Sequence, residues 1–314
     1  MLYGNQGCMK RKILFAVLLI FLVVALFNLD VQGIAHSVMQ ISVQALLLLI
    51  GLQIVTQLLV NFQWFSIARA TGIMISFWDM LYVNTQGAVV DSITPGVKFG
   101  GEVTRAMRLR SVCDISTEQS AALVTFQKLF STSVFLLFCL ISAIFLLGEM
   151  PYLWLVLIGV FVLFALIGLA VFLFRSKIKG YISALKESLA TLRSKPKFCV
   201  LMGLWSVLIW VLYPVKLLIL TYSFIAEADV FFIAATTFAA YLVALVPIFP
   251  GGLGGFEGTM SALLVSVGFV LNEAVAVTVL FRFFTFWFVL LLSLVFIGVY
   301  RILSRRGGRP RPPE

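Results

Sequence analysis

The sequence has few charged residues, a single histidine and few cysteines, and each shortage excludes a class of protein. Charged residues make up 11% of the chain and hydrophobic residues 62%, which excludes a soluble globular domain. The four cysteines follow no CxxC spacing, and His36 has no second imidazole near it, so we expect unpaired thiols, a loop histidine and no metal site. No serine, histidine and carboxylate set suggests a hydrolase, and no cofactor motif is present, so we expect the protein not to be an enzyme.

Long apolar runs predict an all-α polytopic membrane protein with about six full transmembrane helices. No A-x-A-like cleavage site follows the first run, which favours a transmembrane helix over a signal peptide. The formal net charge is +10, and the basic residues lie at the ends of these runs. This indicates an anionic membrane surface, and not a nucleic acid, as the partner. The predicted crossings are residues 13–27, 39–64, 118–147, 151–174, 198–224 and 273–300.

Two stretches rich in proline and glycine interrupt the apolar pattern, Pro95 to Glu102 and Pro250 to Glu257. In a bilayer, non-helical backbone persists only where protein or a water-filled cavity shields it from lipid, so broken helices mark candidate sites. We expect the backbone of two hairpin tips at Pro95, Gly96, Gly100, Gly101, Pro250, Gly251, Gly252, Gly254 and Gly255.

The two stretches belong to an internal repeat. Pro95 and Pro250, like Glu102 and Glu257, are 155 residues apart, and the register predicts repeat elements at about 73–147 and 230–303 within one membrane domain, 1–303. If residues 73–94 crossed the membrane, the basic residues after them would lie outside, against the positive-inside rule, so a re-entrant hairpin is predicted. Three crossings then separate the hairpins, which makes the repeat inverted.

This topology puts both termini on the cytoplasmic side of the cell membrane. Of the 23 Lys and Arg, only Lys128, Lys216 and Arg282 fall within predicted spans, and none falls in an external loop. Residues 28–37 are expected to form an external loop and residues 304–314 a disordered basic tail. Residues 175–197 are predicted to form an amphipathic helix on an anionic leaflet, with a solvated loop as the alternative.

Two glutamates at the hairpins are candidates for substrate binding. The half-helices predicted to begin near Gly101 and Gly255 point N–H groups and positive dipole ends into the protein, which favours an anion such as phosphate. Glu102 and Glu257 lie in the first turn of those helices. Each either caps its own helix or pairs with a basic residue and is released when substrate arrives.

Arg282 is the most informative basic residue. It lies about 14 Å into its span, at about 1.5 Å per residue, where a charge needs a polar cavity or a partner such as Glu257. Lys128 has a similar depth in the first repeat, one position off the register. Either residue could contact substrate.

Three further basic residues complete the candidate substrate site. Lys216 lies nearer the outer end of its span and either contacts substrate or snorkels to the membrane surface. Arg105 and Arg108 form a basic face near the cytoplasmic side, which suits either a phosphate or the headgroup boundary.

The chain resembles the lysylphosphatidylglycerol synthase transmembrane (flippase-like) family over about residues 10 to 303. The motifs that carry the resemblance are Thr94 to Glu102 with Arg105, Phe249 to Glu257, and Leu280 to Phe283. The resemblance implies a bacterial or archaeal multi-pass membrane protein that moves a lipid between leaflets. It carries over Glu102, Arg105, Glu257 and Arg282 as functional positions.

Two departures from that family limit what the resemblance implies. Full synthases carry a soluble aminoacyl transferase domain after the membrane part, whereas this sequence stops at Glu314, so we expect no synthesis of aminoacylated lipid by the chain alone. Where the family has an acidic and arginine pair followed by an aspartate, the sequence reads Gln127-Lys128-Leu129-Phe130-Ser131. Ion coupling or a lipid specificity that uses this aspartate is therefore not expected.

The leading hypothesis is translocation of a phospholipid or polyprenyl-phosphate-type lipid between leaflets. A non-transporting partner that binds lipid for a separate lipid-modifying membrane enzyme is one alternative, and an ion-coupled small-solute transporter is another. Membrane lipids are the expected partners, and a homo-oligomer is compatible with the sequence.

Overall fold

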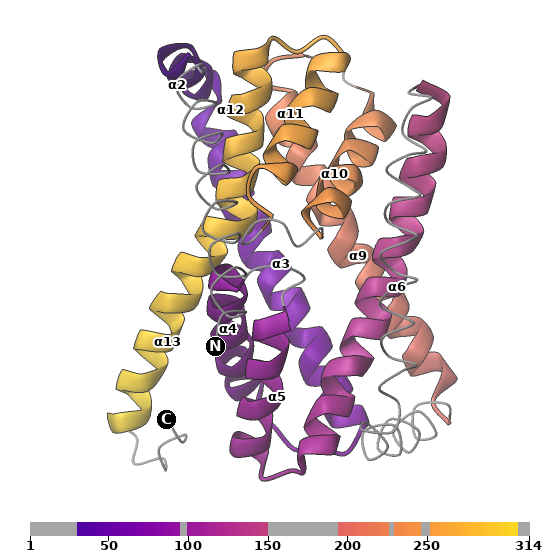
Figure 1. Ribbon diagram of the computed structural model, residues 1–314. Helices are drawn as coiled ribbons and strands as arrows, with labels where there is room; N and C mark the ends of the chain where they lie inside the picture. The colour runs from indigo at the N-terminus through magenta and orange to yellow at the C-terminus, as the bar shows by residue number, and fades with distance from the viewer. Residues whose placement is uncertain (1–29, 95–98, 150–193, 226–228, 246–251, 307–314) are drawn as a thin grey trace, which may run out of the picture.

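The computed structural model describes residues 30–94, 99–149, 194–225, 229–245 and 252–306, and within these ranges the chain is helical with no strand (Figure 1). The elements are α2 (Val31–Gln40), α3 (Val43–Ala70), α4 (Phe77–Ile93), α5 (Phe99–Cys113), α6 (Thr117–Glu149), α9 (Pro196–Thr221), α10 (Val230–Ala244), α11 (Gly255–Ser266), α12 (Leu271–Arg282), the π-helical segment η2 (Phe283–Trp287) and α13 (Phe288–Arg306).

Four helical segments of the described chain are long and apolar enough to cross a membrane: Val43–Ala70, Thr117–Leu146, Pro196–Thr221 and Leu271–Ser304. They correspond to four of the six predicted crossings, which confirms the prediction of a helical membrane protein. The predicted crossings at 13–27 and 151–174 lie outside the described residues, as do most of the predicted amphipathic segment and the tail.

The outward surfaces of these long helices are apolar. Leu47 and Leu48 of α3 are more than half exposed, as are Leu201 and Leu204 of α9 and Ile144 of α6. Large apolar side chains exposed in such number would drive a soluble protein to aggregate, so they indicate a surface that contacts lipid.

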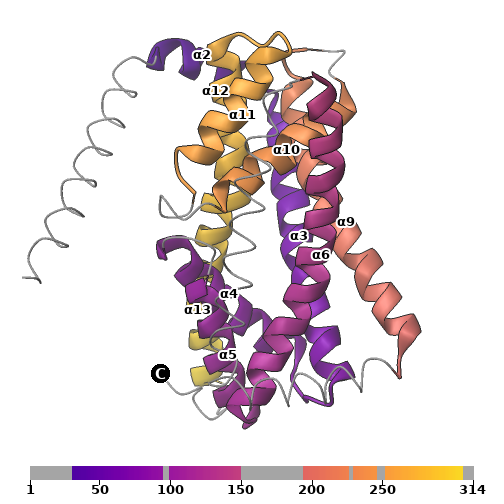
Figure 2. The ribbon, with the colours of Figure 1, turned by 45° about the vertical axis from the view of Figure 1, so that its right-hand side comes forward.

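Two pairs of shorter helices lie in opposite halves of the molecule. Figures 1 and 2 show α4 and α5 side by side in the lower half, and α10 and α11 in the upper half. In both views the end of α4 and the start of α5 approach mid-height from below, and the end of α10 and the start of α11 approach it from above. The four ends are therefore directed toward the middle of the molecule.

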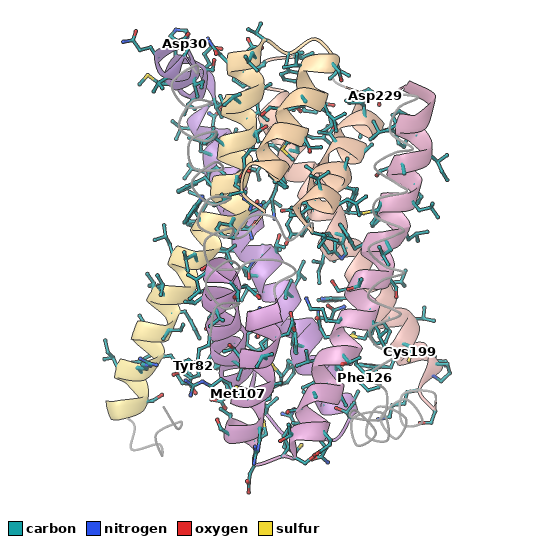
Figure 3. All side chains as sticks on the ribbon, viewed as in Figure 1. Asp30, Tyr82, Met107, Phe126, Cys199 and Asp229 are labelled. Atoms are coloured by element: carbon teal, nitrogen blue, oxygen red, sulfur yellow. The ribbon has the colours of Figure 1, made fainter. Side chains whose placement is uncertain are left out.

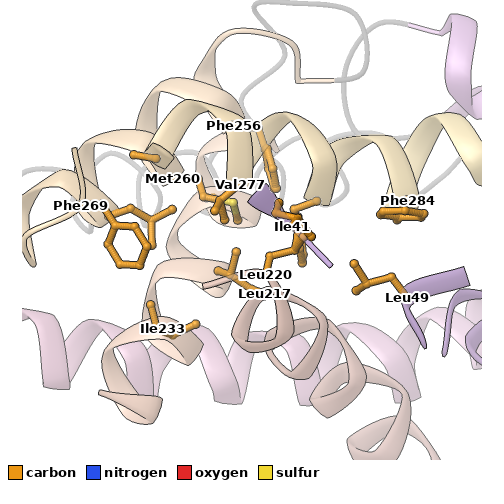
Figure 4. Packing of buried hydrophobic residues seen from close by; sticks show 14 residues of the cluster. Ile41, Leu49, Leu217, Leu220, Ile233, Phe256, Met260, Phe269, Val277 and Phe284 are labelled. Carbon is orange, nitrogen blue, oxygen red and sulfur yellow. The ribbon is translucent and has the colours of Figure 1, made fainter. Parts of the chain in front are cut away.

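Each half has its own apolar core. In the upper half, Phe256 and Met260 of α11 pack with Val277 of α12, Leu217 of α9 and Ile233 of α10 (Figure 4). In the lower half, the core joins α3, α4, α5, α6 and α9 through Trp64, Met80, Leu109, Phe126 and Met202. Because each pair of short helices is buried against long helices, the long helices fix the position of both pairs.

The lower end of α13 is tied to α4 by polar contacts. The Tyr300 hydroxyl donates a hydrogen bond to Asp79, and Arg301 Nε donates to the Tyr82 hydroxyl at 3.2 Å. The rings of Tyr82 and Tyr300 stack with centroids 4.4 Å apart. These contacts explain how α4 remains attached to the last span although it ends near the middle of the molecule.

The structure corrects three boundaries. The predicted external loop at 28–37 is wrong, because Val31–Gln40 is a helix whose N-terminus is capped by Asp30, which accepts a hydrogen bond from Gly33 N at 2.9 Å. His36 therefore lies on a helix, and not in a loop, and its ring Nδ1 is hydrogen-bonded to Gln40 Nε2 at 3.2 Å. The second span begins at Val43, not at residue 39, and ends at Ala70. Pro196 and Lys197 belong to α9, not to the segment before it.

Candidate functional site

Four charged side chains from three helices form the first charged cluster: Asp91, Glu102, Arg105 and Lys128. Arg105 Nη2 lies 3.1 Å from Asp91 Oδ2, and Arg105 Nη1 lies 2.9 Å from Glu102 Oε1. The same Glu102 oxygen lies 2.7 Å from Lys128 Nζ. The three side chains other than Lys128 are at most 15% exposed, so these pairs are screened by little water.

The local sequence makes room for this cluster. Gly87 of α4 faces Arg105, and a Cβ at Gly87 would lie 2.6 Å from Arg105 Cγ. The Arg105 guanidinium also lies over the ring of Trp64, 5.7 Å from its centroid. A buried guanidinium is thus held between two carboxylates and an aromatic face.

Asp91, and not Glu102, caps α5. Its Oδ1 accepts a hydrogen bond from Gly101 N at 3.0 Å, which satisfies a free N–H in the first turn of the helix. Glu102 was expected either to cap its helix or to pair with a basic residue. In the structure it pairs with Arg105 and Lys128. Sequence reasoning did not identify Asp91 as the cap of α5, because the contact between Asp91 and Gly101 depends on how α4 packs against α5.

Glu257 and Arg282 form the second charged cluster. Glu257 Oε1 lies 3.3 Å from Arg282 Nε, which confirms the predicted pair. Glu257 Oε2 accepts a hydrogen bond from Gly254 N at 2.7 Å, so the same carboxylate also caps α11. The two roles that the sequence offered as alternatives for Glu257 occur together.

Aromatic rings enclose the guanidinium of Arg282. Its Cζ lies 4.6 Å from the ring centroid of Phe256 and 4.7 Å from that of Phe286, and its side chain is 7% exposed. The π-helical segment η2 begins directly after Arg282. Such π-turns within α-helical spans are frequent at functional sites, and nothing in the sequence predicted this one.

The backbone before α11 needs glycine at two positions. Gly252 has φ 73° and Gly254 has φ 83°, in the left-handed region that side chains disfavour. α11 begins at Gly255 as predicted, whereas α5 begins at Phe99, two residues before Gly101. The remaining predicted tip residues, Pro95, Gly96, Pro250 and Gly251, lie outside the described residues.

Lys216 is the centre of a third polar group, the lysine cluster, with Gln53, Thr56 and Tyr213. Its Nζ donates hydrogen bonds to Gln53 Oε1 at 2.7 Å and to Thr56 Oγ1 at 2.8 Å, and lies 4.7 Å from the Tyr213 ring centroid. The residue has no exposed surface. Lys216 therefore does not snorkel, because α3 supplies its polar partners inside the protein.

Other predicted residues lie outside these clusters or at their edge. Arg108 is half-buried, three residues beyond Arg105 on α5. Lys128 is 42% exposed, so it is the most accessible member of the first charged cluster. The two arginines that the sequence grouped as one basic face therefore differ in environment.

A neutral polar network was missed by sequence reasoning. Gln127 Nε2 donates to Gln63 Oε1 at 3.2 Å, and Gln63 Nε2 donates to Ser206 Oγ at 2.6 Å. Gln127 occupies the position that corresponds to Arg282 at the offset of 155. The buried polar side chains of α3, at Gln53 and Gln63, were the signal that could have indicated a polar interior here.

The described cysteines are free thiols. Cys113, Cys139 and Cys199 form no disulfide, as predicted, and Cys8 lies outside the described residues. Burial, with a smaller contribution from the charge of Asp79, raises the pKa of Cys113 to about 11, so this thiol stays protonated near neutral pH. Among the described residues, no group of three or more His, Cys, Asp and Glu could hold a metal ion.

The arrangement suits reversible binding of an anion. Arg105, Lys128 and Arg282 are cations within a largely apolar protein, and each contacts a carboxylate at the start of a short helix. A phosphate carries the same kind of oxygen acceptors as a carboxylate, so it can replace Glu102 or Glu257 on the cation and at the helix dipole.

Comparison with known proteins finds two kinds of similarity. The sequence profile of the lysylphosphatidylglycerol synthase TM region matches residues 12–293. A UPF0104 membrane protein of Methanothermobacter thermautotrophicus is 24% identical, in an alignment that covers 77% of this chain and 81% of that protein. A UPF0104 membrane protein of Pyrococcus horikoshii is 20% identical, in an alignment that covers 91% of this chain and 96% of that protein.

Proposed function

The chain belongs to the lysylphosphatidylglycerol synthase transmembrane family, and from that premise we propose that it moves a phosphate-bearing lipid between the two leaflets of a cell membrane. The headgroup passes through the protein interior, while the acyl or prenyl chains stay in the surrounding lipid. In this proposal the protein catalyses no chemical reaction, and its partners are membrane lipids.

The observation that carries the proposal is the contact between Glu257 and Arg282 at the N-terminus of α11. Arg282 lies about 14 Å into its predicted span, at about 1.5 Å per residue, and its side chain is 7% exposed. A charge near the centre of a membrane costs about 2.5–3.5 kcal/mol on insertion scales. A structural role alone would be served by an apolar residue of similar size. A carboxylate that holds an arginine at a helix N-terminus instead keeps an anion site occupied until a phosphate displaces it.

An inverted repeat supports the proposal, because it would present one such site to each side of the membrane. α4, α5 and α6 begin at Phe77, Phe99 and Thr117, and adding 155 to each number gives the starts of α10, α11 and α12 to within two residues. The two hairpins lie in opposite halves of the molecule (Figure 1). We propose that both are re-entrant and that they open alternately.

The distribution of charge supports a cytoplasmic lower end and cytoplasmic termini. Asp30 and Asp229 lie at the upper end (Figure 3). Arg69 and Arg110 lie in the last turns of α3 and α5, which end at the lower end, and Lys195 directly precedes α9 there. Positive residues gather on the cytoplasmic side of membrane proteins, so we propose that the lower end faces the cytoplasm.

The test is leaflet exchange in proteoliposomes that carry a fluorescent phosphatidylglycerol whose outer-leaflet fraction is bleached by an impermeant reductant. We expect the protein to expose inner-leaflet probe faster than protein-free liposomes do. Arg282→Gln should lower the rate at least tenfold, as expected for loss of a charge-assisted contact of about 1.5–3 kcal/mol. Arg110→Gln, an exposed arginine at the end of α5, is the matched control and should keep the rate.

Arg282→Lys distinguishes loss of the site from loss of folding, because it keeps the positive charge and is expected to keep partial activity. Monodisperse elution of each variant in detergent provides the second check. If wild-type protein exchanges neither phosphatidylglycerol nor a polyprenyl phosphate probe faster than empty liposomes, lipid translocation is excluded for these headgroups and the proposal fails.

A further inference from the structure

Lys216 lies on α9 with no exposed surface, enclosed between α9 and α3. Its amine reaches Gln53 Oε1 at 2.7 Å and Thr56 Oγ1 at 2.8 Å. Because the residue is fully enclosed, it does not contact a lipid headgroup in this conformation. The role assigned to it from the sequence, direct substrate binding, therefore does not account for its position.

No carboxylate neutralises Lys216 within the described part of the chain: the ion pairs there join Arg105 and Lys128 to Asp91 and Glu102, and Arg282 to Glu257. An ammonium without a counter-charge in the interior is penalised by several kcal/mol, and loss of its proton removes that penalty. When the amine is charged, two oxygens and the face of Tyr213 are placed to stabilise it. The site therefore stabilises the charged amine through these contacts and the neutral amine by relieving the cost of a buried charge.

The surroundings connect Lys216 to the second charged cluster through aromatic rings. The ring of Tyr213, on the same helix, packs against the ring of Tyr241 of α10, with centroids 5.4 Å apart. The ring of Tyr241 packs against that of Phe256, with centroids 5.0 Å apart. Phe256 in turn lies against Arg282. Among the described residues, Tyr213, Tyr241 and Arg282 are the titratable or charged groups along this path from Lys216. The neighbouring face of α3 contributes the neutral Gln53 and Thr56, and Lys128 of α6 is paired with Glu102.

We propose that Lys216 is a proton-binding site that couples lipid movement to proton movement across the membrane. The lysine ammonium releases one proton to water in one conformation, and the amine takes one up in another. The aromatic rings between Lys216 and Arg282 transmit this change of charge to Arg282 and its anion. This proposal rests on the proposed lipid transport and names its coupling ion.

The experiment uses the same proteoliposomes with an imposed pH gradient of about one unit. This gradient is about a tenfold ratio of proton concentration, so one proton moved per lipid can maintain up to about a tenfold ratio of lipid between the leaflets. The readout is the steady-state ratio of fluorescent phosphatidylglycerol in the two leaflets. Wild-type protein is expected to build an asymmetry of up to about tenfold that collapses when a proton ionophore is added. Lys216→Met should show a ratio near one under the same gradient.

Two further variants make the result specific. Lys216→Arg keeps a positive charge that does not dissociate, so it should remain folded and lose the gradient response. Lys195→Met removes an exposed lysine just before the same helix, whose amine donates a hydrogen bond to Ala70 O at 2.9 Å, and should respond to the gradient as wild type does.

The failures of the two proposals are distinct. If wild-type protein exchanges lipid but its leaflet ratio stays near one under the gradient, coupling through Lys216 is refuted while lipid transport stands. If Lys216→Met and Lys216→Arg both build the wild-type asymmetry, the lysine cluster is only a structural contact. Absence of any exchange by wild-type protein would refute the transport proposal itself.

Discussion

At the scale of single residues, Glu257 combines two tasks that can be separated by substitution. Gln at this position keeps an oxygen for Gly254 N but loses the charge that faces Arg282, whereas Ala loses both. We expect the free energy of unfolding of Glu257→Ala to be about 1 kcal/mol lower than that of Glu257→Gln, because a helix cap usually contributes this amount. Glu257→Ala should therefore unfold at a lower temperature. Thermal unfolding in detergent measures this difference.

Both variants of Glu257 should bind fluorescent phosphatidylglycerol more tightly than wild type in a polarisation assay, because the carboxylate no longer competes for Arg282. Glu273→Gln is the matched control: Glu273 caps α12 through Val270 N at 3.3 Å in the way that Glu257 caps α11. It should leave lipid affinity unchanged. Weaker binding by Glu257→Gln would contradict the view that Glu257 occupies the phosphate position.

Residues of this kind could be predicted from the sequence because a charge within an apolar run stands out. Arg282 was identified for that reason, whereas Glu102 and Glu257 were identified from their place in the first turns of the predicted half-helices. The structure places each of the three in an ion pair. Asp91 and the partners of Lys216 were not identified, since Gln53 is 163 positions from Lys216 and their contact depends on the packing of α3 against α9. Sequence reasoning found the charges and missed most of what they contact.

At the scale of elements, the α4–α5 pair depends on close approach at Gly101. A Cβ at this position would collide with the Asp91 carboxylate, and Asp91 would lose its contacts with Gly101 N and Arg105. We expect Gly101→Ala to lower the free energy of unfolding by about 1–3 kcal/mol, as overpacking usually does. The apparent melting temperature in detergent reports the change.

Gly258→Ala is the matched control for this prediction. Gly258 also lies in the first turn of a short helix, but nothing lies within 4 Å of a Cβ built there. Alanine has the higher helix propensity, so this substitution should stabilise the protein by up to about 1 kcal/mol. Equal effects of the two substitutions would show that the contact between Gly101 and Asp91 is unimportant.

The starts of α5 and α11 could be read from proline and glycine, which end one helix and permit another. The helix α2 could not be read in this way, because its polar composition suggested a loop. Its signal was Asp30, which caps the helix three residues before Gly33. The π-helical segment η2 after Arg282 left no signal in the pattern of apolar and polar residues.

At the scale of the whole molecule, the offset of 155 residues and the placement of basic residues predict that the two hairpins enter from opposite sides of the membrane. Matched positions test this, because Thr117 and Leu271 are the first residues of α6 and α12 and both are exposed. The turns before them lie at the lower and upper ends (Figure 1). A single cysteine at either position reports the side on which that turn lies.

The measurement labels spheroplasts with a membrane-impermeant maleimide, in a background where Cys8, Cys113, Cys139 and Cys199 are replaced by serine or alanine. Leu271→Cys should be labelled in intact spheroplasts, and Thr117→Cys only after the membrane is permeabilised. The reason is the charge distribution, which keeps the arginine-rich end of α5 in the cytoplasm. Labelling of both cysteines from outside would place the two hairpins on one side, and alternating access through an inverted repeat would then be excluded.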